Sequence, residues 1–208
     1  MIKLTPDISV LKDERLKDPR YLRLRCARFD ISKPRSPGMI PTATREFIIS
    51  RSAVAGIVHC PSEEKVLMLR QFRYPIYHET GDAHLAWIYE TVAGLIDDGE
   101  TPMSTFIREV EEEAGVEIEE GNTKFETSYY VSPGFVNEQH FIFTATVDKT
   151  GETSQDGGLD DESEAIVSDW LTYDEIRKLV QGVKDDEGNI HKIVDGKTLM
   201  GLIKIGLA

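Results

Sequence analysis

The order of apolar and polar residues predicts strands in the first half of the chain and helices later. Residues 21–31 (YLRLRCARFDI) alternate like a half-buried strand, and residues 45–60 read as one long strand or two short ones. A proline-rich break separates these stretches. Polar loops are expected at 75–86 and 148–164. Further strands are expected at 65–74, 87–93, 127–131, 140–147 and, as the final strand, 167–172.

The clearest helix covers residues 102–114. Thr101 suits its N-cap, Pro102 its first position and Gly115 the residue after its end. At about 100° per residue, its apolar side chains fall on one stripe, which we expect in the core: Met103, Phe106, Ile107, Val110 and Ala114. Two closing helices are expected at 173–181 and 196–207. Together these elements predict a mixed sheet covered by a few helices.

Charge and composition narrow the classes of partner. The chain has 208 residues, enough for one domain or for one domain with a small subdomain. Its net charge of −13 disfavours nucleic acid and anionic membrane partners. No stretch approaches the roughly 18 apolar residues of a membrane span. The first 20 residues lack the apolar centre of an export signal, and Cys26 and Cys60 lie far apart, as in a reduced cytoplasmic protein.

Three glutamates of the expected helix, Glu109, Glu112 and Glu113, share one flank beside the apolar stripe, whereas Glu111 falls on the opposite flank. Like charges three and four residues apart repel by roughly 0.2–0.5 kcal/mol a pair. Divalent cations such as Mg²⁺, which take oxygen ligands, would explain the cluster. The alternative is a solvated acidic face.

The spacing around this helix favours the first explanation. It runs without a gap or substitution through Gly94, Glu100, Arg108-Glu109-Val110, Glu112-Glu113 and Gly115-Val116. The pattern resembles the Nudix box, and average residue frequencies give a chance match on the order of 10⁻⁹ per window. The resemblance implies metal ligands at Glu109, Glu113 and the Ala93 carbonyl. It places Glu112 beside them and gives Arg108 the role of orienting the carboxylates.

The same resemblance implies an α/β fold, a Nudix α/β/α sandwich with a mixed β-sheet and a small N-terminal antiparallel β subdomain. Residues 1–50 would form that subdomain, which serves dimerisation and substrate contact, and residues 51–208 the Nudix hydrolase domain. The implied cofactor is Mg²⁺, with Mn²⁺ as a substitute. The implied partner is a small nucleoside diphosphate sugar, and the implied assembly is a homodimer in the cytoplasm.

Segments outside the box bear on the substrate. Ser132, Pro133 and Gly134 resemble the SPG element of ADP-ribose pyrophosphatases and are assigned to substrate binding. Four further stretches resemble that subfamily: Arg45-Glu46, residues 71–75, residues 87–94 and Asp195-Gly196-Lys197-Thr198. The implied reaction is hydrolysis of the ADP-ribose diphosphate to AMP and ribose 5-phosphate. Alternatives are a hydrolase of GDP-mannose or another nucleotide sugar, and a non-catalytic Nudix sensor. The complete box and the lack of a basic helix-turn-helix segment disfavour the sensor.

Residue by residue, the resemblance implies the following contacts. Arg73 would hold the diphosphate, because a guanidinium pairs with phosphate oxygens through two hydrogen bonds. Arg45 and Glu46 would contact phosphate and ribose, and Glu138 a ribose hydroxyl. The alternative for each is an ordinary surface side chain.

Two further assignments come from the acidic loop and the N-terminal strand. In the loop at residues 159–164, Glu162 would be the general base and Glu164 one more metal ligand, unless the loop is solvated or the alignment shifted. Tyr21 would stack on the nucleobase of a substrate bound to the partner subunit, or it would be an ordinary half-buried strand tyrosine.

Overall fold

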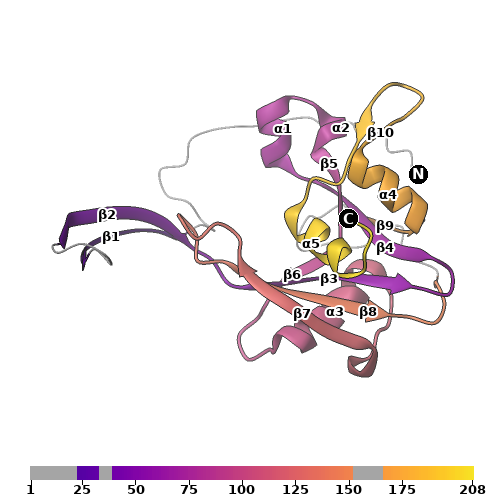
Figure 1. The fold of residues 1–208 in the computed structure, drawn as a ribbon, viewed down its shortest axis with the longest axis horizontal. Coiled ribbons are helices and arrows are strands. Elements are labelled where there is room, and N and C mark those ends of the chain that lie inside the picture. The colour runs from indigo at the N-terminus through magenta and orange to yellow at the C-terminus, as the bar shows by residue number, and fades with distance from the viewer. Residues whose placement is uncertain (1–22, 33–38, 152–165) are drawn as a thin grey trace.

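The computed structural model describes residues 23–32, 39–151 and 166–208, and Figure 1 shows their arrangement. The strands are β1 (Arg23–Ser32), β2 (Met39–Ile49), β3 (Ala53–Cys60), β4 (Lys65–Phe72), β5 (Trp87–Glu90), β6 (Val92–Leu95), β7 (Thr123–Tyr130), β8 (Gln139–Thr146), β9 (Ile166–Thr172), β10 (Val183–Lys184) and β11 (Ile190–His191). The helices are α1 (Tyr74–Thr80), α2 (Ala83–Ala86), α3 (Pro102–Ala114), α4 (Tyr173–Gln181) and α5 (Gly196–Lys204), with a 3₁₀ turn at Glu120–Asn122.

The central sheet has seven strands and is mixed. Strand β3 pairs in parallel with β8, and the remaining pairs of this sheet are antiparallel. Strands β3 and β4 pair only next to their connecting turn, at His59–Val66 and Cys60–Lys65. Beyond that point β6 pairs with β3 and β5 with β4, so the β5–β6 segment lies between the two diverging strands.

Helices cover both faces of this sheet. On one face, Val54 and Val58 of β3 pack in a buried cluster with Phe106 and Val110 of α3. On the other face, Ile57 belongs to a second buried cluster, formed with residues of α4 and α5. Neighbouring side chains of a strand point to opposite faces, which is why β3 feeds both cores. The predicted α/β sandwich with a mixed sheet is confirmed.

Strands β1 and β2 form a separate two-stranded antiparallel sheet that projects from the body (Figure 1). Its end is attached to the body near Ile48, whose N–H donates to the Phe135 carbonyl at 2.7 Å. The Asn137 side chain also accepts from Ser50 N–H at 2.8 Å. The small antiparallel sheet expected at the N-terminal side is therefore present.

The helix of the box has the predicted bounds. The Thr101 hydroxyl accepts from the Ser104 N–H, and Gly115 ends the helix with φ 67°. The predicted stripe is also confirmed, since Phe106, Val110 and Ala114 are buried and its other two members pack against them.

Some element predictions were wrong. The stretch 75–86 is not a loop, because it forms α1 and α2, ended by Gly81 at φ 67° and capped by Asp82 respectively. The range 45–60 forms two strands, as one of the two alternatives had it, but the first of them, β2, begins earlier, at Met39. The range 87–93 is divided into β5 and β6. Strand β9 is not the final one, because the short pair β10–β11 follows it.

Candidate active site

Two glutamates of α3 point at the backbone of β6. One Glu113 carboxylate oxygen accepts the Ala93 N–H at 3.1 Å. The Glu109 carboxylate lies against Gly94 so closely that a Cβ on Gly94 would overlap it. Glycine is therefore required at position 94 by close approach. The Glu109 side chain is 13% exposed and Glu113 is 9% exposed, whereas Glu111 is exposed, so Glu109 and Glu113 are not part of a solvated face.

Arg108 connects the acidic residues of the box. Its Nε donates to one oxygen of Glu100 at 3.0 Å and its Nη2 to the other at 3.1 Å. Its Nη1 donates to Glu112 at 2.6 Å and lies 3.0 Å from Glu109. The hydrogen bond from Arg108 lowers the pKa of Glu100 to about 2. One guanidinium thus offsets the repulsion among the carboxylates of this helix.

These groups line one side of an open cleft of about 650 Å³. Arg73, Lys197, Glu138 and His140 line it as well. The cleft therefore brings the box carboxylates together with cationic side chains from the end of β4 and from α5.

A buried carboxylate holds two of those cations. Arg73 donates to the two oxygens of Glu90 at 2.6 Å from Nε and 2.8 Å from Nη2. The Lys197 ammonium donates to Glu90 and forms an ion pair with Asp195 at 3.0 Å. Burial would raise the pKa of Glu90, but the hydrogen bond from Arg73 and the charge of Lys197 outweigh it and lower that pKa. Glu90 is therefore an anion in the folded protein at neutral pH.

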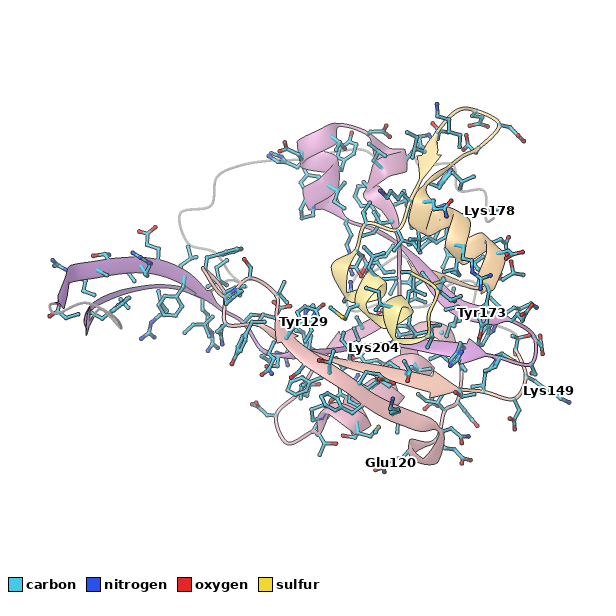
Figure 2. All side chains as sticks on the ribbon, in the orientation of Figure 1. Glu120, Tyr129, Lys149, Tyr173, Lys178 and Lys204 are labelled. Carbon is cyan, nitrogen blue, oxygen red and sulfur yellow. The ribbon has the colours of Figure 1, made fainter. Side chains whose placement is uncertain are left out.

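Glu138 is held by an imidazole. His140 Nε2 lies 2.7 Å from Glu138 Oε1, and the Tyr129 hydroxyl lies 3.4 Å from His140 Nδ1. Burial raises the pKa of Tyr129 to about 12, helped by the charges of Asp195 and Glu138. The phenol thus keeps its proton and can donate to Nδ1, which leaves Nε2–H to donate to Glu138. Tyr129 lies toward the end of β7 beside the hairpin (Figure 2).

The donor set is suited to Mg²⁺. Glu109, Glu113 and the Ala93 carbonyl offer hard oxygen ligands, which are the ligands that Mg²⁺ takes in proteins. The glycine at 94 leaves room for the Glu109 carboxylate beside that backbone. In the described ranges, no three His, Cys, Asp or Glu side chains converge as a ready ligand group. A bound ion would therefore be held by two side chains and a carbonyl of this part of the chain.

The family described as the NUDIX domain matches residues 50–192, which is more than half of the chain. The chain belongs to the NUDIX family. This NUDIX protein is 30% identical to an ADP-ribose pyrophosphatase of Haemophilus influenzae over 160 residues, covering 77% of the chain and 71% of the relative.

Two other relatives of this NUDIX protein cover more of the chain. A methanol dehydrogenase activator of Bacillus methanolicus is 30% identical over 194 residues, which is 93% of the chain and 90% of the relative. A GDP-mannose pyrophosphatase of Escherichia coli is 27% identical over 200 residues, which is 95% of the chain and 94% of the relative. In the described residues, no helix has the length and apolar character needed to span a membrane.

The structure brings together seven of the residues that the Nudix resemblance singled out. They line the cleft described above: Arg73, Ala93, Arg108, Glu109, Glu112, Glu113 and Glu138. It does not bring the others to this cleft within one chain. Arg45 and Glu46 lie exposed on β2, and Ser132, Pro133 and Gly134 lie in the turn between β7 and β8. Tyr21, Glu162 and Glu164 lie outside the described residues.

Sequence reasoning missed Glu90, His140 and Lys197 as site residues of this NUDIX protein. A signal existed for Glu90, which is a charged residue at the end of a short apolar strand (WIYE). Lys197 lies in the closing motif that resembled ADP-ribose pyrophosphatases, but nothing in its neighbours indicated that it reaches the cleft. His140 lies near the start of β8, two residues after Glu138, which directly precedes that strand.

Proposed function

We propose that this NUDIX hydrolase cleaves the diphosphate of ADP-ribose in an Mg²⁺-dependent reaction, giving AMP and ribose 5-phosphate. The observation that carries the proposal is one cleft that is lined by Glu109 and Glu113 together with Arg73 and Lys197. Carboxylates of this kind suit a divalent cation, and the two cations suit an anionic diphosphate. The relative named ADP-ribose pyrophosphatase supports the choice of substrate.

The charge of the cleft supports the need for a metal ion. Six carboxylates and four cationic side chains line it, so its formal charge is −2 with His140 counted as neutral. A nucleoside diphosphate is itself an anion and would be repelled by such a lining. A divalent cation at Glu109 and Glu113 would bring this formal charge to zero next to the diphosphate.

The proposed reaction is a displacement at phosphorus. When bound, Mg²⁺ would supply polarisation of the phosphate and activation of water. Glu162 would accept a proton from the attacking water as the water oxygen bonds to phosphorus and the bridging P–O bond breaks, so that each half leaves as a phosphomonoester. Arg73 holds non-bridging oxygens and stabilises the charge that develops on them. Arg108 keeps Glu109 and Glu112 in place.

A second candidate substrate is GDP-mannose. The observation favouring it is the relative of that name, whose match covers 95% of the chain, β1 and β2 included. A ligand sensor without turnover is a third candidate, of a different class. The diphosphate is common to both substrates, so Arg73 and Lys197 of the cleft suit either of them.

One experiment separates the three candidates. The purified protein is given ADP-ribose, GDP-mannose, ADP-glucose and UDP-glucose, each with Mg²⁺ and with EDTA, and the released phosphomonoesters are measured. We expect ADP-ribose to have the highest kcat/KM, at least about tenfold above the others, and EDTA to stop the reaction. Preference for GDP-mannose would select the second candidate. No hydrolysis with tight ligand binding would select the sensor.

The roles proposed in the acidic loop are separable by metal titration. Glu162→Gln should lower kcat by about 10²–10⁴-fold without rescue by added Mg²⁺, because a general base acts only as the water loses its proton. Glu164→Gln should raise the Mg²⁺ concentration needed for half activity, and added metal should restore part of the rate. The reverse pattern would show that the two roles are exchanged. If neither variant slows the enzyme tenfold, Glu112 and Glu138 are the next carboxylates to test.

A further inference from the structure

We infer that Glu90 is a positioning residue, which holds Arg73 and Lys197 together as one preorganised cationic site for the substrate diphosphate. The inference rests on the proposed function, because it assigns the diphosphate to Arg73. It adds a residue that touches no substrate itself. Glu90 is 2% exposed and lies behind the two cations, which line the cleft.

The first observation is the geometry of the Arg73–Glu90 pair. Two hydrogen bonds, from Nε and Nη2, fix the plane of the guanidinium against the carboxylate. Such a bidentate pair defines an orientation as well as a charge. The Arg73 side chain is nevertheless 39% exposed, while the side chain of Glu90 taken alone is 3% exposed, so the arginine is reachable from the cleft and the glutamate is not.

The second observation is that Lys197 meets the same carboxylate from a distant part of the chain. It is 12% exposed and donates to Glu90 from the first turn of α5, 107 residues away in sequence. Each cation alone could take other positions around a flexible stem. Because both cations donate hydrogen bonds to the same Glu90 carboxylate, each restricts the positions that the other can take.

The third observation is that the surrounding backbone is itself fixed. Asp195 caps α5 by accepting from Thr198 N–H at 2.9 Å and from its hydroxyl at 2.6 Å. The Thr198 hydroxyl oxygen accepts from the Thr91 N–H at 2.8 Å. Thr91 directly follows Glu90 and donates its hydroxyl to the Gly56 carbonyl. The start of α5 is thus tied to the chain beside Glu90, which sets the distance between Lys197 and Arg73.

This arrangement has a consequence for binding. Side chains that are ordered before the substrate arrives lose little conformational entropy when it binds. If Glu90 loses its charge, the two cations repel each other and the guanidinium plane is no longer set. We therefore expect weaker binding of the diphosphate, although the net charge of the site becomes more positive. A residue with only a structural role would change the amount of folded protein and leave KM unchanged.

The kinetic test uses Glu90→Gln, which keeps the shape and removes the charge. We expect KM for ADP-ribose to rise at least about tenfold, with kcat changed less than KM. The matched control is Glu126→Gln, since Glu126 is 11% exposed, pairs with Lys124 at 2.9 Å and accepts from Thr144 at 2.8 Å away from the cleft. The control should leave KM within twofold. An unchanged KM in Glu90→Gln would overturn the inference.

A double variant tests whether Glu90 acts through Arg73. Arg73→Met removes the guanidinium, and adding Glu90→Gln should then lower kcat/KM by a smaller factor than Glu90→Gln does in the wild type, because only its contact with Lys197 remains to be lost. Full additivity of the two effects would contradict positioning through Arg73.

A spectroscopic measurement keeps the inference separate from the proposed function. The Arg73 Nε–H signal, assigned in ¹⁵N spectra by its loss in Arg73→Met, should be protected from exchange at pH 7 in the wild type. It should lose that protection in Glu90→Gln and keep it in Lys197→Met. If Glu90→Gln does not fold, an unprotected signal in the wild type still overturns the inference. If no nucleotide sugar is hydrolysed, the proposed function fails. Binding of inorganic pyrophosphate then decides whether the cationic site of Arg73 and Lys197 holds a diphosphate.

Discussion

The cleft and the projecting hairpin β1–β2 are built in opposite ways. In the cleft, polar side chains are buried and paired, as in the contacts of Glu90 with Arg73 and Lys197. On the hairpin, apolar side chains are exposed: Leu24 is 63% exposed and Phe29 is 41% exposed. Figure 2 shows the hairpin side chains standing clear of the other described elements along its outer half.

This difference indicates which region is complete within one chain. The cleft side of the molecule pairs its buried carboxylate Glu90 with two cations of the same chain, Arg73 and Lys197. A two-stranded sheet alone is marginally stable in water, because it has no second layer on which to bury a face. We therefore expect the hairpin to pack against a second subunit, which would also bring Arg45, Glu46 and Tyr21 near a cleft.

The largest effect should come from the cleft. Glu113→Gln should lower kcat about a thousandfold, because loss of a metal ligand removes several kcal/mol of transition-state stabilisation. The fold should survive, since glutamine can still accept from the Ala93 N–H. Hydrolysis rates at saturating Mg²⁺ and thermal melting check both statements.

Glu111→Gln is the control for that variant. Glu111 is on the same helix and exposed, and the hydrolysis rate of Glu111→Gln should stay within a few-fold of the wild type. A near wild-type rate in Glu113→Gln would exclude Glu113 as a metal ligand.

A glycine substitution tests the metal side of the cleft more finely. A Cβ in Gly94→Ala displaces the Glu109 carboxylate, so the Mg²⁺ concentration for half activity should rise by about tenfold or more. The matched control is Gly121→Ala, since a Cβ there meets nothing within 4 Å. Metal titration of activity in both variants is the measurement. An equal Mg²⁺ requirement in both would contradict a role for Glu109 in holding the ion.

The hairpin prediction concerns assembly. We expect a homodimer in light scattering, with twice the 23.4 kDa mass of the chain. Leu24→Asp should weaken association about tenfold or more, because it places a charge on the face that the partner would cover. Ile203→Asp, at a 54% exposed apolar residue on α5, should not. A monomer at micromolar concentration would refute the dimer and remove Tyr21 from the site.

The smallest effect is a pH dependence at Glu100. Its pKa of about 2 in the folded protein lies below the ordinary 4.5. The stability that it contributes is therefore present above about pH 4.5 and is lost as the pH falls through about 2. Melting temperatures of wild type and Glu100→Gln should differ by a few degrees at pH 6 and converge near pH 2. A difference independent of pH would mean that Arg108 does not depress this pKa.

A feature of the fold or of the site could be predicted from the sequence where the residues that cause it are close together in the chain. The bounds of α3 follow from Thr101, Pro102 and Gly115, all within or beside the helix. The helices α1 and α2 have seven and four residues, which is too few to show a helical period, so their polar sequence predicts a loop. The role of Glu90 needs contacts with Arg73 and Lys197, which lie 17 and 107 residues away. No pattern in neighbouring residues can indicate contacts over such separations in sequence.

The short segment that forms β5 and β6 has a consequence for the spacing of groups along the cleft. Glu90, behind the cationic pair, and Ala93, beside the proposed metal site, are three residues apart on one segment. That segment is pinned at Thr91 by bonds to Thr198 and Gly56. The backbone between Glu90 and Ala93 therefore holds the carboxylate behind Arg73 and Lys197 at a fixed spacing from the Ala93 carbonyl. Under the proposed function, discrimination between ADP-ribose and GDP-mannose would fall to segments outside this stretch, such as α1–α2 or the turn between β10 and β11.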